Sequence, residues 1–397
     1  MNSKQLINQI DLAFDAGKNQ FGLELLREYN SSNFADAASW YRQAVVEEQI
    51  GDWAAAGNAY YKCIELAPHI STAYLYAGYW LEQSNHLDAA SSLYSLCQEI
   101  DPNLLIVNAS SSQVSPTILR SKSGSTLLRT HLSNQHRMYA NSYAFSKRIR
   151  GAIWAQTHDK PVTYRQGDFA PNLFYIPDLP QKPYYEKKEF NWTDSISQNS
   201  SIIIDELNTA LDDNAVKKQL RPYLAKEFHT PESLANLAGS KEWSALDLFR
   251  DGKQNSVTKP LFKKTLELIS SIPTYSLDET PFEVFFSLLK PGQEISPHYG
   301  QSNHSLTVHL ALEIPPDCFL EVAGEQRKWE KGELIIFDDS YLHSAHNQSD
   351  EIRIVLIFSV WHPSLSKDEH TAIQQCFKLR QQWMSKRTTK LQQLQPE

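Results

Sequence analysis

Two side chains in the last third of the chain have types and positions that indicate a binding site. His298 stands in SPHYGQ, two residues before Gly300, where many metal sites place an acidic ligand. Arg353 lies in EIRIVLIFSVW, an apolar run typical of a buried strand. Burying an arginine there costs several kcal/mol unless a carboxylate pairs with it. The sequence therefore predicts an anion at Arg353, from either the protein or a ligand.

In the segments around these residues, apolar and polar residues alternate. This is typical of strands in which one face is buried in the core and the other can carry functional side chains. In HSLTVHLALEIP the leucines and Val308 share one side, whereas Ser305, Thr307 and His309 share the other. In PFEVFFSLLKPG, Glu283 and Ser287 lie on the same side. We expect this strand-rich stretch, roughly residues 282–361, to hold the site.

The first hundred residues contain an internal repeat instead of strands. Pro68 and Pro102 are separated by 34 residues, and the same spacing relates small and aromatic positions. The matched pairs are Ala44 with Gly78, Ala56 with Ala90, Tyr60 with Tyr94, and Cys63 with Cys97. This pattern resembles the tetratricopeptide repeat of paired antiparallel helices. Residues 3–35 have helical spacing and are expected to be a degenerate first repeat. A stack of such repeats offers a groove for a peptide or protein partner, or only dimerises the protein or supports the neighbouring domain.

Charge is distributed unevenly along the chain, whose formal net charge is -8. Residues 107–165 carry nine Lys and Arg against Asp159 alone, and 107–126 are rich in serine. We interpret 107–165 as a basic linker followed by a bridging helix. The overall negative charge argues against a nucleic-acid partner.

Other features bear on the compartment. The four cysteines are dispersed, which favours a reducing environment over a disulfide framework. The sequence contains neither a signal-peptide core nor a stretch of about 18 apolar residues, so no membrane insertion is expected. A cytoplasmic location is the expectation.

Several segments together carry a family resemblance. His298-Tyr299-Gly300, then FDDSYLH ending at His343, Arg353 ten residues later and VWHP closely resemble the aspartyl/asparaginyl β-hydroxylase family of iron and 2-oxoglutarate oxygenases. The resemblance covers roughly residues 170–365. It implies a catalytic domain folded as a double-stranded β-helix.

The resemblance also implies a ligand set. His298 and His343 would be the two Fe(II) ligands, and the family has glycine where Gly300 stands, so 2-oxoglutarate completes the site. Arg353 would pair with the distal carboxylate of 2-oxoglutarate.

Further contacts follow from the same resemblance. Ser287 and His309 match supporting contacts to the cosubstrate, and Trp243 matches a tryptophan that lines the pocket.

The sequence departs from the family at some positions. Ser305 and Thr307 stand where the family often has arginines that hold a substrate carboxylate, and Ser359 stands where it has an aspartate. Asp338 and Asp339 are expected to hydrogen-bond a turn before His343. Three further histidines remain unassigned, His304, His346 and His362.

The expected fold class is multidomain. Tetratricopeptide-like, all-α repeats occupy 1–106, the basic linker and bridging helix 107–165, and the oxygenase domain 166–397. The last combines a jelly-roll or cupin-like double-stranded β-helix with flanking helices and a C-terminal helix.

The expected function is Fe(II)- and 2-oxoglutarate-dependent hydroxylation at the β-carbon of an Asp/Asn-type side chain. The substrate would be a polypeptide or amino-acid-type molecule. Two alternatives remain open at this point. One is a helical-repeat adaptor whose barrel is catalytically silent, and the other is a hydroxylase of a small-molecule or lipid-linked substrate.

Overall fold

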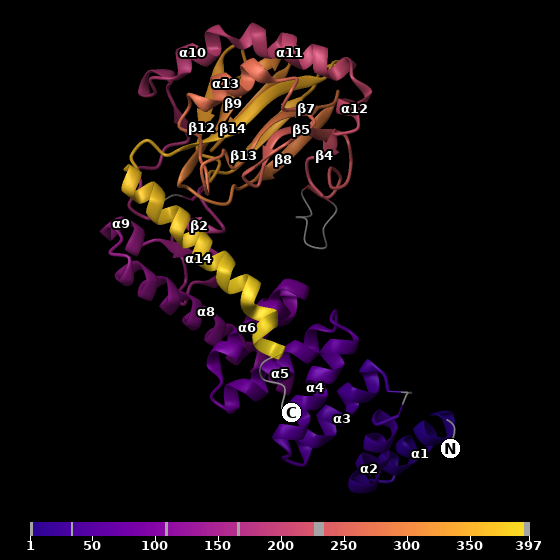
Figure 1. The fold of residues 1–397 in the computed structure, drawn as a ribbon. Helices are drawn as coiled ribbons and strands as arrows, with labels where there is room; N and C mark the ends of the chain where they lie inside the picture. Colours follow the sequence, from indigo (N-terminus) through magenta and orange to yellow (C-terminus); the bar gives the residue numbers. More distant parts are fainter. Residues whose placement is uncertain (1–2, 33–34, 108–109, 165–166, 226–233, 393–397) are drawn as a thin grey trace. The chain divides into compact units, whose positions relative to one another are not determined.

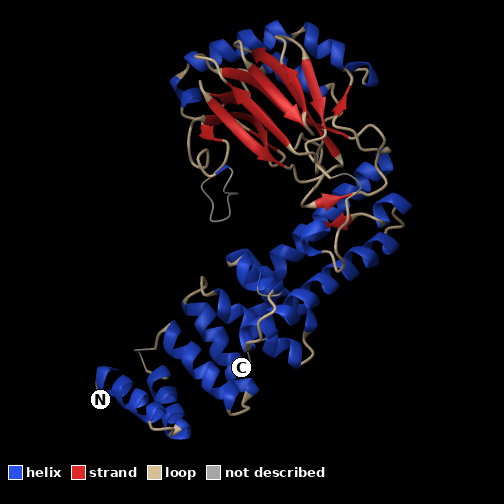
Figure 2. Ribbon diagram, turned by 180° about the vertical axis from the view of Figure 1, so that it is seen from behind, coloured by secondary structure: helices blue, strands red, loops and turns tan. Residues whose placement is uncertain are grey.

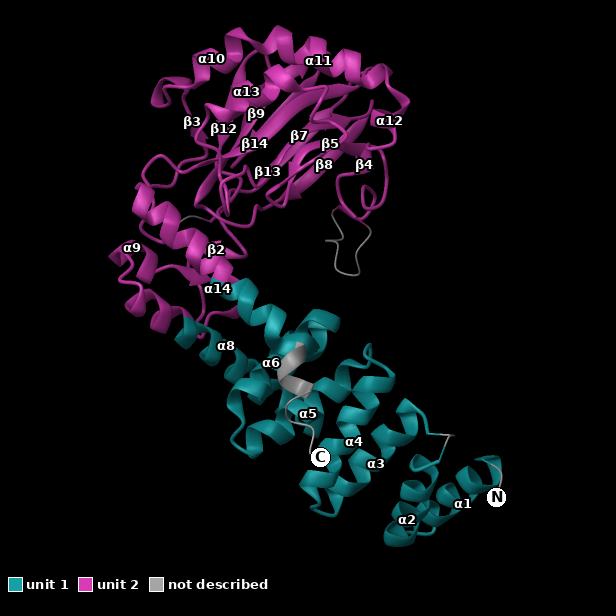
Figure 3. Cartoon of the chain, in the orientation of Figure 1, with its two compact units in different colours: residues 1–135, 379–397 teal, residues 136–378 magenta. Residues whose placement is uncertain are grey.

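The computed structural model describes residues 3–32, 35–107, 110–164, 167–225 and 234–392. The chain forms two compact units, shown in Figure 3. The first comprises residues 1–135 and 379–397, and the second comprises residues 136–378. This division differs from the expected segments, whose limits at residues 106 and 165 stay predictions.

The first unit is built from helix pairs whose starts recur every 34 residues. The helices are α1 (Ser3–Asp15), α2 (Asn19–Asn30), α3 (Ala37–Gln49), α4 (Trp53–Leu66), α5 (Ser71–Gln83) and α6 (Leu87–Ile100). Thus α1, α3 and α5 begin at equivalent positions, as do α2, α4 and α6. The expected helical repeat is confirmed, and residues 3–30 follow the same period.

Close helix packing explains the small residues of the repeat. Ala44, Ala56 and Ala90 are fully buried. A Cβ added at Gly78 would lie 2.8 Å from the Tyr94 ring, so any larger residue would have to displace that ring. The Tyr94 hydroxyl donates to Glu82 Oε2 at 2.6 Å. Apolar packing and a satisfied buried hydroxyl together fix each helix pair.

The serine-rich segment expected as a linker differs from that expectation. Helix α8 (Pro116–Ser142) already begins within it, after a π-helical turn, η1 (Asn103–Val107). Leu128 and Leu132 of α8 are buried in the core of the helix pairs, and Ser121 Oγ donates to Leu104 O at 2.8 Å. Tertiary packing thus makes helical a segment whose composition is typical of a loop.

Two large antiparallel sheets dominate the described part of the second unit, in which β1 (Ile153–Trp154) and β2 (Phe174–Tyr175) form a separate two-stranded sheet. The larger has the strand order β3-β12-β9-β14-β7-β5-β4, with β6 paired to β5, and the smaller has β11-β10-β13-β8. The strands of the larger sheet are β3 (Tyr184–Tyr185), β4 (Arg221–Pro222), β5 (Trp243–Arg250), β6 (Lys253–Gln254), β7 (Val284–Leu289), β9 (Ser305–Glu313), β12 (Leu334–Phe337) and β14 (Arg353–Trp361). Those of the smaller are β8 (Gln293–His298), β10 (Cys318–Val322), β11 (Glu325–Lys328) and β13 (His343–Asn347). This is the expected double-stranded β-helix.

The larger sheet separates two apolar layers. Its outer face, with Phe286, Val308 and Leu356, packs against helices α11 (Ser200–Asp212) and α13 (Lys263–Ser270), which cover it in Figures 1 and 2. Its inner face, with Phe285 and Ile357, belongs to a separate cluster that includes residues of the smaller sheet. The alternation expected along residues 282–312 therefore decides which side chains face the space between the sheets.

Several short elements and one long C-terminal helix complete the chain. They are α9 (Lys147–Arg150), β1 (Ile153–Trp154), η2 (Ala155–Thr157), β2 (Phe174–Tyr175), η3 (Lys187–Glu189), α10 (Thr193–Gln198), α12 (Asn214–Lys217) and α14 (Lys367–Gln392). Within the described ranges, no helix has the length and apolar character needed to cross a bilayer. All four cysteines are buried free thiols.

Asn347 fixes the end of β13 to the end of β7. Its side-chain amide donates to the carbonyls of Leu289 at 2.9 Å, Lys290 at 3.1 Å and Glu351 at 2.8 Å, and the side chain is fully buried. We expect Asn347→Ala to lower the free energy of unfolding by about 2–4 kcal/mol, because one buried and two partly buried hydrogen bonds to backbone carbonyls are lost. Chemical denaturation measures this.

The matched control for this substitution is Asn208→Ala, at an exposed position of α11. We expect a change within about 0.5 kcal/mol there. Equal effects of the two substitutions would contradict the role assigned to Asn347.

Candidate functional site

A cavity of about 600 Å³ lies between the two sheets of the second unit. All six side chains singled out from the sequence line it: His298, His343, Arg353, Ser287, His309 and Trp243. They come from both sheets, with the histidine pair on the smaller one. The fold thus brings together residues that are as far apart as 243 and 353 in the chain.

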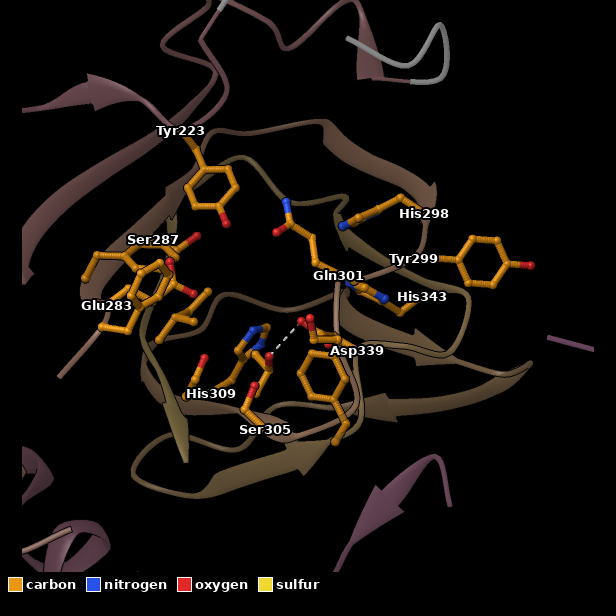
Figure 4. Close-up of a pocket in the computed structure, with 18 of the residues that line it drawn as sticks. Tyr223, Glu283, Ser287, His298, Tyr299, Gln301, Ser305, His309, Asp339 and His343 are labelled. Carbon is orange, nitrogen blue, oxygen red and sulfur yellow. Dashed lines mark hydrogen bonds between the residues drawn. The ribbon is translucent and has the colours of Figure 1, made fainter. Parts of the chain in front are cut away.

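The two histidines face one another across a strand pair. His298 ends β8 and His343 begins β13, where they are register partners, and their ring centroids are 4.1 Å apart (Figure 4). Nδ1 of His298 donates to Ser296 O at 2.8 Å, and Nδ1 of His343 donates to Tyr341 O at 2.9 Å. With each Nδ1 proton held by a carbonyl, Nε2 carries the lone pair.

The electrostatic surroundings keep both rings neutral. Burial, and then the neighbouring His343, lowers the pKa of His298 to about 4. Burial also lowers the pKa of His343 to about 4. Two neutral imidazoles with oriented Nε2 atoms suit a divalent transition metal. Among the described residues, no group of three or more His, Cys, Asp or Glu is placed to hold a metal, so protein ligation here would rest on a histidine pair.

Arg353 is buried in the same cavity without a counter-ion. Its side chain is 1% exposed, and within the described structure Nε and Nη2 have no hydrogen-bond partner. Burial lowers its pKa to about 10, so the guanidinium remains charged at neutral pH. Its central carbon lies 5.1 Å from the Trp329 ring centre. The charge expected to need an anion is thus present, and two donors remain for a ligand carboxylate.

The remaining predicted contacts surround Arg353 on the inner face of the larger sheet. Trp243 Nε1 donates to Ser287 Oγ at 3.0 Å, which leaves the serine proton available. His309 stacks on Trp329 with ring centres 5.9 Å apart, and burial lowers its pKa well below the usual range. Its Nδ1 has no partner in the described part of the chain. Ser287 and His309 can therefore both bond a ligand held by Arg353.

The two aspartates before His343 have different positions. Asp338 Oδ1 accepts from Ser340 N at 2.9 Å, which is the turn expected from the sequence. Asp339 instead lines the cavity, where Thr307 Oγ1 donates to its Oδ2 at 3.1 Å (Figure 4). Assigning both aspartates to the turn was therefore wrong for Asp339.

Gly300 makes room for this carboxylate. A Cβ at residue 300 would lie 2.3 Å from the carboxyl carbon of Asp339. Burial raises the pKa of Asp339 to about 6, against the lowering effects of Thr307 and His298. The glycine in SPHYGQ was the sequence signal for a close neighbour, but the sequence does not say which one.

Sequence reasoning also missed Glu283 as a cavity residue, although its place on the Ser287 side of the strand was a usable signal. Glu283 lines the cavity beside Tyr223 and Ser287 in Figure 4. Burial, then Asp339, raises its pKa to about 7. The two carboxyl groups at this end of the cavity therefore come from the residue just before β7 and from the segment just after β12.

The unassigned histidines and the departures from the family have distinct places. His304, Ser305 and Ser359 line the cavity. His346 stacks on Phe319 with centres 4.4 Å apart, and His362 Nε2 lies 2.8 Å from the Tyr185 hydroxyl. The latter two have partners outside the cavity.

Comparison with known proteins agrees with the motifs. Residues 197–363 match the sequence model of the family described as Aspartyl/Asparaginyl beta-hydroxylase. The human protein named aspartyl/asparaginyl beta-hydroxylase is 28% identical over 218 residues, 53% of this chain and 27% of that protein. Aspartate beta-hydroxylase domain-containing protein 2 of Xenopus tropicalis is 28% identical over 243 residues, 60% of this chain and 63% of that one.

The match thus spans about a quarter of the human relative and less than two thirds of the Xenopus tropicalis relative. Among solved structures, the cupin domain of Schizosaccharomyces pombe Cnp3 is similar over 31% of this chain and 67% of that chain, with 11% identity and a TM-score of 0.21. So low a score supports no inference. The similarity to the aspartyl/asparaginyl β-hydroxylase family therefore rests on the sequence matches, and the match to the family model lies within residues 197–363.

Proposed function

We propose that the chain is a Fe(II)- and 2-oxoglutarate-dependent dioxygenase that hydroxylates the β-carbon of an Asp/Asn-type side chain in a protein or peptide. The observation that carries the proposal is the buried, unpartnered Arg353 in the cavity that also holds the His298 and His343 pair. A site with a fixed cation and two neutral imidazoles fits a dicarboxylate cosubstrate that also ligates a metal. The family match supports the hydroxylase class.

The residues present fit both groups. His298 and His343 would hold the metal through their Nε2 atoms, because backbone carbonyls fix each Nδ1 proton. Arg353 would bind the distal carboxylate of 2-oxoglutarate through its free Nε and Nη2 donors. Iron with 2-oxoglutarate would supply the coupled chemistry: dioxygen would oxidise 2-oxoglutarate to succinate and CO2, with one oxygen atom going to succinate and the other into a C–H bond of the substrate.

The protein's own part is positioning and exclusion of water. Ser287, held by Trp243, and His309, stacked on Trp329, flank the cosubstrate end of the cavity. Phe285 and Phe337 also line the cavity and give it apolar walls. Such walls strengthen the ion pair at Arg353, because they lower the local dielectric. A preorganised cosubstrate leaves the opposite end, near Asp339 and Glu283, for the substrate.

Succinate formation tests the proposal. The purified chain with Fe(II), ascorbate, 2-oxoglutarate and candidate peptides is expected to form succinate, and one peptide should gain the mass of one oxygen atom. Absence of both 2-oxoglutarate binding and succinate formation above a His298→Ala control would contradict the proposal. That result would favour the adaptor alternative.

The packing of Gly300 against Asp339 leads to a separate prediction. Gly300→Ala is expected to displace the Asp339 carboxylate and to lower succinate formation by about tenfold or more, without unfolding the domain. In an Asp339→Ser background the added methyl group has room, so Gly300→Ala should then change the rate by less than about twofold. Steady-state rates of the four proteins measure this coupling. Additive effects would show that the contact does not matter.

A further inference from the structure

The end of the cavity away from Arg353 is formed by a row of polar residues across neighbouring strands. Thr307 of β9 and Ser359 of β14 are register partners, and Asp339 follows β12, which is paired with β9. Glu283 immediately precedes β7, which is paired with β14. We call these four residues the outer row. Its two ends are carboxylates and its middle consists of hydroxyl groups.

The outer row lacks a positive charge. Among the described residues that line the cavity, Arg353 is the only Arg or Lys, whereas Asp251, Glu283 and Asp339 are acidic. Arg221, whose charge acts on Glu283, is already engaged by Asp247 at 2.7 and 2.9 Å. In the described structure the Glu283 carboxylate itself accepts no hydrogen bond. Partly buried carboxylates without a counter-ion are costly, so this end is electrostatically incomplete.

Aromatic residues line the same cavity as Glu283. Tyr223, Tyr275 and Phe282 all line this cavity, and the Glu283 charge contributes to raising the pKa of both tyrosines after burial. Tyr223 also stacks on Phe285 with ring centres 5.2 Å apart. Aromatic faces beside a carboxylate are a recurrent environment for organic cations.

A buried, unpartnered histidine is an independent sign of a ligand at this end. His304 is 2% exposed and lines the cavity, and neither of its ring nitrogens has a partner in the described part of the chain. Its ring lies 4.6 Å from that of Tyr275. A neutral imidazole in this position can accept a hydrogen bond from a ligand, as the carboxylates of the outer row can.

We propose that the outer row binds a positively charged group of the substrate, a guanidinium or an ammonium. The enzyme's substrate therefore carries a basic side chain close to the Asp/Asn-type residue that reacts, as a basic peptide does. The inference rests on the proposed function, since it assigns the substrate class of the same cavity. A basic side chain next to the reacting residue would satisfy both proposals, with the cation at Glu283 and the reacting carbon near the histidine pair.

Matched ligands that differ only in charge test the inference. The probes are N-acetyl-arginine N-methylamide, its neutral isostere N-acetyl-citrulline N-methylamide, and the corresponding aspartate and lysine derivatives. Calorimetry under nitrogen gives Kd values for the full chain with Fe(II) and 2-oxoglutarate, and separately for the chain without them. We expect the arginine probe to bind at least about tenfold more tightly than the citrulline probe, and the aspartate probe to bind most weakly. Free arginine as a further arm separates an amino-acid substrate from a peptide.

Glu283→Gln is the decisive variant, because it removes the charge and keeps the shape. We expect it to reduce the preference for arginine over citrulline to less than about threefold. Glu294→Gln removes an exposed carboxylate of β8 outside the cavity and should leave the preference unchanged.

Three results would overturn the inference: equal binding of arginine and citrulline, tighter binding of the aspartate probe, or no binding of the arginine probe. Retained preference in Glu283→Gln would also do so. Loss of succinate formation with the cation preference intact would instead count against the proposed oxygenase reaction.

Discussion

Alanine at His298 or His343 is expected to lower the rate of succinate formation by roughly a hundredfold or more, because each substitution removes one of the two proposed protein ligands. A site with three protein ligands retains two after such a loss, whereas this one retains a single imidazole. The two substitutions should therefore be equally severe. Their effect on folding should be small, since both side chains are partly open to the cavity. Rates with saturating Fe(II) and 2-oxoglutarate, together with thermal unfolding, measure both effects.

His346→Ala is the matched control for the histidine pair. This residue lies on the same strand as His343, but it stacks on Phe319 and does not line the cavity. We expect the variant to keep the wild-type rate within about twofold, because the contacts it loses, with Phe319, Ser344 and Glu294, are made by residues that do not line the cavity. Comparable losses in all three alanine variants would show that the effect comes from disturbing β13.

Substitutions of Arg353 are expected to have opposite effects on stability and on cosubstrate binding. Arg353→Met removes a buried charge that has no protein counter-ion, so the free chain should become more stable, by about 1–4 kcal/mol. The same substitution should abolish the stabilisation that added 2-oxoglutarate gives the wild-type chain. Arg353→Lys should raise the apparent 2-oxoglutarate requirement severalfold or more, since the compact ammonium group of lysine cannot form the paired hydrogen bonds of the planar guanidinium group.

Arg221→Met is a control that is expected to change the stability of the chain in the opposite direction. Arg221 has a protein counter-ion, Asp247, so its removal leaves a carboxylate unpaired and should destabilise the chain by about 3 kcal/mol. Thermal unfolding with and without 2-oxoglutarate distinguishes the two arginines. If Arg353→Met were also destabilising and the wild-type chain gained nothing from 2-oxoglutarate, Arg353 would be structural.

Much of this organisation could be predicted from particular residues. The spacing of 34 residues between Tyr60 and Tyr94 predicts the helix pairs, because each small or aromatic residue occupies an equivalent packing position in successive repeats. The alternation through Ser305, Thr307 and His309 predicts which side of β9 faces the cavity, since the period of a strand is two. Local patterns of this kind are therefore sufficient to predict these features of the fold.

The parts that could not be predicted depend on contacts between distant segments. Helix α8 begins inside a serine-rich segment because Leu128 and Leu132 pack on the repeat core, which composition does not show. Asp338 and Asp339 are chemically identical neighbours, and Asp339 lies against Gly300, which is distant from it in the chain. The residue that packs against a small residue is determined by the tertiary structure, so the neighbouring sequence does not identify it.

An anaerobic titration of the full chain with Fe(II), in the presence and absence of 2-oxoglutarate, tests the central claim most directly. Because only two protein side chains would hold the metal, we predict binding of one Fe(II) per chain that tightens at least about tenfold with 2-oxoglutarate and gives the visible absorption of the chelate. His298→Ala and Arg353→Met should each remove this coupling. Fe(II) binding that is indifferent to 2-oxoglutarate, or unchanged in both variants, would contradict the account.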